Sequence, residues 1–157
     1  MLKKILLFGF FINASLSAVA QSVTFKELLS INNSKNENPI LGSKHFKIVF
    51  RKSFGNVDTV KCWYKNKTSL DPEIIITGIR STPANYKPSR DINYSTYNNA
   101  YILTLKNQVI ANGFLFKNKR SKKTYDDYTY LKGDLHVHVI IQKQKNVRSS
   151  VVIRHFY

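Results

Sequence analysis

Residues 45–54 read HFKIVFRKSF, and this stretch decides the fold class. Phe46, Ile48 and Phe50 recur at every second position, with the charged residues Lys47 and Arg51 between them. Successive side chains of a β-strand point to opposite faces of the sheet, so this alternation predicts a strand with one dry face and one wet face.

Similar patterns continue from this strand to the end of the chain. Short turns separate them, and short connections favour antiparallel neighbours because parallel pairs need long crossovers. The sequence therefore predicts a mainly β protein with about eight antiparallel strands, as a small barrel, a sandwich or a curled meander. The further strands are expected in TVKCWYK (59–65), EIIITGI (73–79), a hairpin over 100–116 that turns near 106–108, TYDDYTYL (124–131), GDLHVHVIIQKQ (133–144) and SSVVIRHFY (149–157).

One short helix is expected before the strands, in TFKELLSI over residues 24–31. Thr24 followed by Glu27 three positions later is the pattern of a capping box. Phe25 and Leu28 recur at helical spacing and would face the core. No internal repeat and no second domain are visible in the sequence.

The first residues have the anatomy of a secretory signal. Lys3 and Lys4 precede an apolar run, and an A-x-A pattern ends at Ala20. We expect a signal peptide over residues 1–20 and a single β-rich exported domain over 21–157, located in the periplasm or outside the cell. No later stretch is apolar enough to be a membrane helix.

The chain is strongly basic. Its formal net charge is +16, and removing Lys3 and Lys4 leaves +14 (16 − 2), which favours attraction to anionic polymers and surfaces. Cys62 is the only cysteine, so no internal disulfide can form. The abundance of asparagine, lysine, isoleucine and tyrosine resembles exported proteins of AT-rich bacteria.

A long connection without apolar periodicity is expected over residues 81–99, STPANYKPSRDINYSTYNN. Connections of this length inside a compact domain are often binding loops. Tyrosines can stack on sugar rings or bases while a neighbouring cation pairs with an acidic group. We therefore take Arg90, Tyr94 and Tyr97 as candidate ligand-binding residues.

The densest basic stretch is KNKRSKK, residues 117–123, which we expect at a hairpin tip. Lys119 and Arg120 complete the predicted ligand-binding set. An exported protein meets anionic glycans and lipopolysaccharide, so we expect such a polymer or surface as the partner, with nucleic acid a less expected one. The sequence indicates no cofactor, and it predicts no oligomeric state.

The stretch GDLHVHVII, residues 133–141, contains two histidines one residue apart. The five residues DLHVH resemble the opening motif of polymerase-and-histidinol-phosphatase-type metal hydrolases, which implies His136 and His138 as metal ligands. No carboxylate side chain follows His138, whereas a catalytic zinc site needs three protein ligands. We therefore interpret the motif as a strand that carries histidines on its wetter face.

Two alternatives remain open. A tight turn at residues 145–146 would bring His136, His138 and His155 onto one face, as in a small metal-binding protein or hydrolase. The second alternative is an outer-membrane β-barrel, or a structural domain that contacts other proteins through its exposed strand edges. No nucleophile motif is present, so we expect a binding protein rather than an enzyme.

Overall fold

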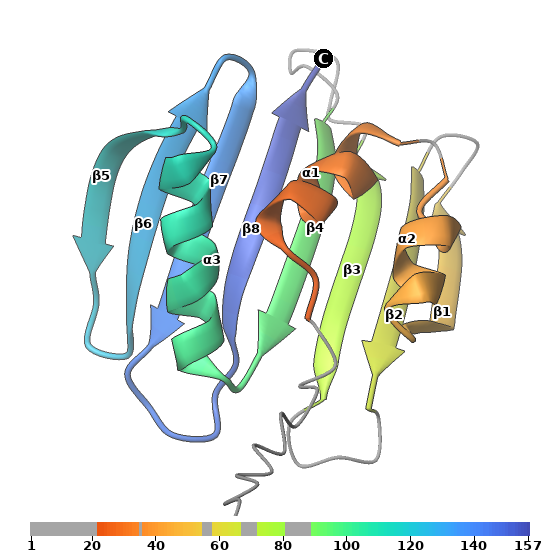
Figure 1. Cartoon of the computed structure of the whole chain (residues 1–157), viewed down its shortest axis with the longest axis horizontal. Coiled ribbons are helices and arrows are strands. Elements are labelled where there is room, and N and C mark those ends of the chain that lie inside the picture. Colours follow the sequence, from red (N-terminus) through yellow and green to blue (C-terminus); the bar gives the residue numbers. More distant parts are fainter. Residues whose placement is uncertain (1–21, 35, 55–57, 67–71, 81–88) are drawn as a thin grey trace, which may run out of the picture.

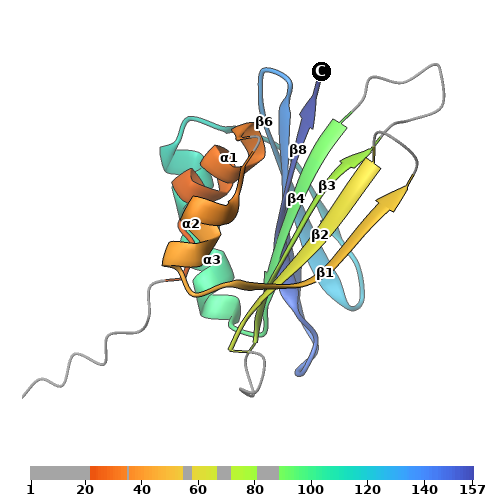
Figure 2. The ribbon, with the colours of Figure 1, turned by 90° about the vertical axis from the view of Figure 1, so that its right-hand side faces the viewer.

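The described chain forms one antiparallel sheet with helices on one of its two faces (Figures 1 and 2). The signal peptide predicted over residues 1–20 lies outside the part of the chain that is described. No helix among the described residues is long and apolar enough to cross a membrane. The computed structural model describes residues 22–34, 36–54, 58–66, 72–80 and 89–157.

The strands follow the order β1-β2-β3-β4-β8-β7-β6-β5 across the sheet. The helices are α1 (Phe25–Asn33), α2 (Asn38–Ser43) and α3 (Asn99–Ala111). The strands are β1 (Lys47–Phe54), β2 (Asp58–Lys65), β3 (Glu73–Arg80), β4 (Ser89–Thr96), β5 (Leu115–Ser121), β6 (Tyr125–Lys132), β7 (Leu135–Gln142) and β8 (Ser149–Phe156).

The predicted fold class is confirmed, because all eight strands pair in antiparallel fashion. The sheet is not closed: β1 and β5 lie at its opposite edges. Of the three predicted forms, the barrel and the sandwich are therefore excluded, and the arrangement is an open sheet covered on one face.

The hairpin predicted over residues 100–116 is wrong. Most of this segment forms α3, which Asn98 caps by accepting a hydrogen bond from the Tyr101 amide at 3.0 Å. Ile102, Leu105 and Val109 are the buried residues of α3, and their spacing is helical. The many β-branched and aromatic residues of the segment favoured a strand, but burial against the sheet selected the helix.

The long connection predicted over residues 81–99 is also wrong in its second half. Residues 89–96 form β4, at the centre of the sheet, and residues 81–88 lie outside the described part. The polar residues in this strand hid its period-2 pattern. Asp91, one of its buried polar residues, is paired with Arg154 of β8 through two contacts of 2.9 Å.

The capping box predicted for α1 is confirmed. The Thr24 hydroxyl accepts a hydrogen bond from the Glu27 amide at 3.2 Å, and the Glu27 carboxylate accepts one from the Thr24 amide at 2.8 Å. Phe25 and Leu28 are fully buried, as predicted. They pack α1 onto the central strands of the sheet.

The two halves of the chain have the same architecture. In each half, four consecutive antiparallel strands follow helical structure, which is α1 and α2 in the first half and α3 in the second. The last strands of the halves, β4 and β8, pair with each other. Both edge strands shift register at equivalent points, at Val49 in β1 and at Lys117 in β5. Trp63 and Tyr130 are buried at corresponding positions of β2 and β6. Equivalent positions share burial rather than residue type, which is why the sequence shows no repeat.

The core lies between the helices and the covered face of the sheet. At its centre, Ile92 pairs with Ile153 and Tyr94 with Val151 across the junction of the two halves, and all four are fully buried. None of the described helices lies on the opposite face of the sheet (Figure 2).

Candidate functional site

The tips of the β5–β6 and β7–β8 hairpins lie side by side at one end of the molecule (Figure 1). The Lys143 amide donates to the carbonyl oxygen of Thr124 at 2.8 Å, and the Lys143 ammonium donates to the carbonyl oxygen of Lys122 at 2.8 Å. The turn that ends the basic stretch at residues 117–123 therefore lies beside the lysines that follow β7.

Asp126 is the acidic residue at the centre of this surface. The Lys143 ammonium lies 2.8 Å from its Oδ1 and the Lys119 ammonium 3.2 Å from its Oδ2. Hydrogen bonds from Lys143, Ser121 and Lys119 lower the pKa of Asp126 to about 2. One carboxylate thus holds two cations, and the local charge stays positive.

Tyr128 adds an aromatic face beside these lysines. The Lys106 ammonium, from α3, lies 3.7 Å from the centre of the Tyr128 ring, and the Lys119 ammonium lies 5.1 Å from it. Interaction with Tyr128 and Asp126 raises the pKa of Lys119. The negative face of the ring attracts both ammonium groups and so holds these two cations close to it.

A shallow depression of about 320 Å³ continues the surface toward the end of β4. Tyr97, Asn99, Lys143 and Lys145 belong to its lining. The guanidinium of Arg148 lies 4.3 Å from the centre of the Tyr97 ring, and Tyr97 as a residue is 37% exposed. An aromatic ring beside several cations is suited to a ligand that combines rings with negative charge.

We call this surface the tip patch. It carries five cations, one carboxylate and two aromatic rings. Its cations are Lys106, Lys119, Lys143, Lys145 and Arg148, its carboxylate is Asp126, and its rings are Tyr97 and Tyr128.

The structure separates the five predicted ligand-binding residues. Lys119 and Tyr97 lie in the tip patch. Arg120 is exposed on the opposite face of β5. In the β5–β6 register its Cα atom lies opposite that of Asp127. Arg90 lines a different cavity, beneath α2.

The prediction that Tyr94 binds a ligand is wrong. Tyr94 is fully buried, its hydroxyl donates to the Glu73 carboxylate at 3.0 Å, and its ring packs against Tyr101. Burial and the Glu73 charge raise the pKa of Tyr94. Because it points from β4 into the core, it cannot stack on a ligand.

The predicted cluster of three histidines is also wrong. In the β7–β8 pair, His136 lies opposite Arg154 and His155 opposite Leu135, one residue away from the predicted register. Since neighbouring positions face opposite ways, His155 is on the helix-covered face, while His136 and His138 are on the open face. Within the described residues, no three metal-ligating side chains come together.

His138 and His136 have separate partners on the open face. The Nδ1 atom of His138 lies 3.2 Å from the Asp127 carboxylate, and the His136 ring contacts the Phe156 ring edge-on, with 4.9 Å between their centres. Both contacts are those of ordinary strand residues with cross-strand neighbours.

We expect His136 to be neutral at pH 7. Burial, followed by the charges of His138 and Arg154, lowers its pKa. A histidine with a lowered pKa in the folded state binds its proton more tightly when unfolded, so its contribution to stability is lost as the pH falls below about 6.5. An NMR titration of the His136 ring measures this pKa, and a midpoint at or above 6.5 would contradict the expectation.

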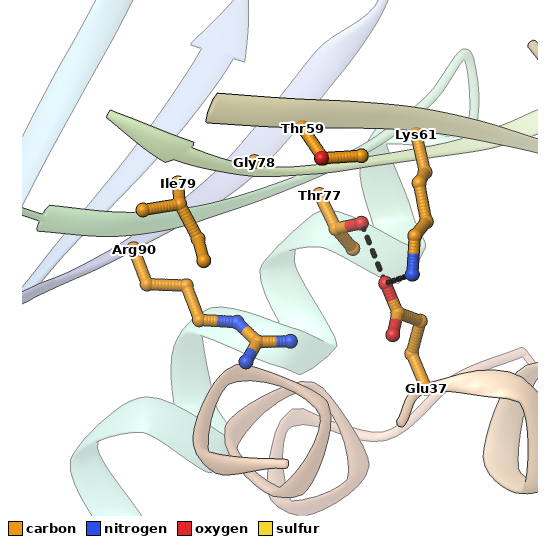
Figure 3. Close-up of a pocket in the computed structure, with 7 residues that line it drawn as sticks. All are labelled: Glu37, Thr59, Lys61, Thr77, Gly78, Ile79 and Arg90. Atoms are coloured by element: carbon orange, nitrogen blue, oxygen red, sulfur yellow. Dashed lines mark hydrogen bonds and ion pairs between the residues drawn. The ribbon is translucent and has the colours of Figure 1, made fainter. Parts of the chain in front are cut away.

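A second polar site lies beneath α2 (Figure 3). Glu37, the residue before the first turn of α2, is 2% exposed. Its Oε1 accepts hydrogen bonds from the Lys61 ammonium at 3.0 Å and from the Thr77 hydroxyl at 3.1 Å. The cavity measures about 290 Å³ and is lined by Glu37, Thr59, Lys61, Thr77, Gly78, Ile79 and Arg90.

Glu37 is ionised in this cavity. Burial acts to raise its pKa, but the hydrogen bond and charge of Lys61, with its other hydrogen bonds, outweigh burial and lower the pKa below its usual value. A third cavity, of about 390 Å³ on the open face, differs because its charged residues Asp91 and Arg154 are paired with each other.

Comparison of the chain with protein-family models, with curated proteins and with solved structures finds no significant match.

Sequence reasoning missed most of the tip patch and all of the Glu37 site. Lys143 and Lys145 were visible only as turn residues, and nothing local indicates that their turn packs on the β5–β6 turn. Glu37 is separated from Lys61 by 24 positions. The one available signal was that Glu37 lies two positions before Pro39 in a chain with few acidic residues, which suggests a buried or paired acid.

Proposed function

We propose that the chain is an exported, non-catalytic binding protein for an anionic polymer or surface, such as a glycan or lipopolysaccharide, and that the tip patch is its binding surface. The observation that carries this proposal is the sharing of Asp126 by Lys119 and Lys143. Asp126 is the only carboxylate among the described residues of the patch, and Lys119 and Lys143 already pair with it. The other cations of the patch are therefore left to attract an external anion.

The release of counterions favours such binding at low salt. Counterions condensed on a polyanion are released when the cations of the protein neutralise its row of negative groups. The charge of +16 over the whole chain adds long-range attraction. Tyr97 adds the part that does not depend on charge, since its exposed ring can pack against a sugar ring or another planar group.

The alternative of a structural or protein–protein role through strand edges stays a prediction. The sheet has its edges at β1 and β5. On β1, Ile48 and Phe50 are 47% and 50% exposed. On β5 the lysines and the register shift resemble the devices by which edge strands avoid pairing with other chains.

The proposal is tested by measuring binding to a sulfated glycan, lipopolysaccharide and DNA at low salt and at about 0.5 M salt, where long-range attraction is screened. We expect one ligand to remain bound at high salt and Tyr97→Ala to weaken that binding about tenfold, the scale of one lost stacking contact. Tyr157→Ala, at another exposed tyrosine, is the control and should change little. If every ligand dissociates at the same salt and both variants match the parent, the proposal fails.

A further inference from the structure

The cavity beneath α2 contains a buried carboxylate oxygen that lacks a hydrogen-bond partner. The Oε1 atom of Glu37 is satisfied by Lys61 and Thr77, but its Oε2 atom is buried and makes no hydrogen bond within the described part of the chain. Leaving a buried acceptor unsatisfied costs free energy, so native proteins rarely do so without a reason. A donor from a bound ligand would satisfy this atom.

Arg90 faces the same space from the other side of the cavity (Figure 3). Its side chain reaches in from β4, and no hydrogen bond or ion pair ties it to another described residue. A guanidinium presents a planar fork of donors that fits a carboxylate in two parallel hydrogen bonds. The cavity thus offers a donor fork on one wall and a buried acceptor on the other.

The charges of the cavity favour a ligand with a single negative charge. Lys61 and Arg90 contribute two positive charges and Glu37 one negative charge, which leaves +1 (2 − 1). A monoanion would make the site neutral, whereas a zwitterion would leave it charged. The volume of about 290 Å³ is just below the range of roughly 300–1,000 Å³ for small-molecule sites, which suits a small ligand. Ile79 and the methyl groups of Thr59 and Thr77 give the C–H face of such a ligand an apolar contact.

We propose that this cavity binds a sugar acid, a hydroxylated monocarboxylate, with its carboxylate on Arg90 and a hydroxyl donating to Oε2 of Glu37. The occupant can be a free sugar acid or one residue of an acidic glycan chain, because both present the same groups. The inference does not depend on the tip patch, which lies at the other end of β4.

The test is a calorimetric titration of the purified protein with sodium glucuronate, and separately with glucose and sodium acetate. Glucose lacks the carboxylate that Arg90 would bind, and acetate lacks the hydroxyl that Glu37 would accept. We expect glucuronate to bind at least tenfold more tightly than either. Equal binding of acetate and glucuronate would overturn the proposal.

Variants identify the site. Arg90→Gln should weaken glucuronate binding at least tenfold, and Arg90→Lys, which keeps the charge without the fork, should weaken it nearly as much. Arg51→Gln makes the same substitution at an exposed arginine of β1 and should leave binding unchanged. Because Arg90 has no described partner, its variants should fold normally. If Arg51→Gln and Arg90→Gln weaken binding equally, the effect is that of net charge and the proposal fails.

A trisaccharide of a uronic acid, titrated in parallel, distinguishes the two sources. Tighter binding of the trisaccharide than of glucuronate identifies a residue within a glycan chain, and equal or weaker binding identifies the free acid. In both cases Arg90→Gln must weaken binding. Replacing Lys143 and Lys145 by glutamine should leave glucuronate binding unchanged, so failure of the tip-patch proposal is distinguishable from failure of this one.

Discussion

Replacing Lys65 by methionine is expected to destabilise the protein by about 3–5 kcal/mol, the cost of breaking a buried ion pair by removing one partner. The Lys65 ammonium lies 3.5 Å from the Glu73 carboxylate, and their side chains are 3% and 11% exposed. The hydroxyls of Tyr94 and Ser22 also donate to Glu73, at 3.0 and 3.1 Å. Without Lys65, this carboxylate keeps its hydrogen bonds but loses the positive charge that compensates it.

Urea unfolding followed by the fluorescence of Trp63, the only tryptophan, measures the free energy of unfolding. Lys132→Met is the matched control, because Lys132 is the corresponding residue of β6 but is exposed and donates only to a backbone carbonyl oxygen. We expect it to cost less than about 1 kcal/mol. The double variant Lys65→Met with Glu73→Leu should recover part of the loss, because no unpaired charge remains. Similar small losses for Lys65→Met and Lys132→Met would contradict this account.

The strands could be predicted where apolar and polar residues alternate along the chain. In β7 this alternation matches the burial of Val137 and Val139. In β1 it predicted the strand nearly within its observed bounds, but the predicted dry face is wrong, because Ile48 and Phe50 are 47% and 50% exposed. In β4 the alternation of apolar and polar residues is hidden, because polar residues such as Asp91 are stabilised by partners on other strands. In α3, apolar residues occur both at helical spacing and between it, so Leu103 and Ile110 are exposed and blur the pattern.

The candidate sites depend on tertiary contacts that no local pattern encodes. Composition pointed to Lys119 and Tyr97, but only the packing of two hairpin tips joins them to Lys143. The histidine cluster failed by a single residue of register, since the β7–β8 turn places His136 opposite Arg154. In a sheet, one residue of register is enough to move a side chain to the other face.

Removing three positive charges from the tip patch is expected to weaken binding to an anionic polymer about 100-fold at low salt. Each cation near an anionic surface contributes roughly 1 kcal/mol, and about 3 kcal/mol corresponds to slightly more than a hundredfold change in affinity. The variant combines Lys143→Gln, Lys145→Gln and Arg148→Gln. These residues surround the exposed ring of Tyr97, so the loss falls on the surface that we propose contacts the ligand.

The control is Lys47→Gln, Arg51→Gln and Lys52→Gln, three exposed cations of β1 at the opposite side of the sheet. Both triple variants lower the formal charge by three, from +14 to +11 (14 − 3) once Lys3 and Lys4 are removed, so a purely long-range attraction would weaken equally in the two. A localised site predicts that the affinity of the tip variant depends less steeply on salt than the affinity of the control. Each contact removed lowers the slope of log affinity against log salt by about 0.7–0.9, so the tip variant should lose roughly two to three units of slope while the control loses almost none. Equal losses of slope and affinity would show that the charge acts from the whole surface and that the tip patch is not a binding site.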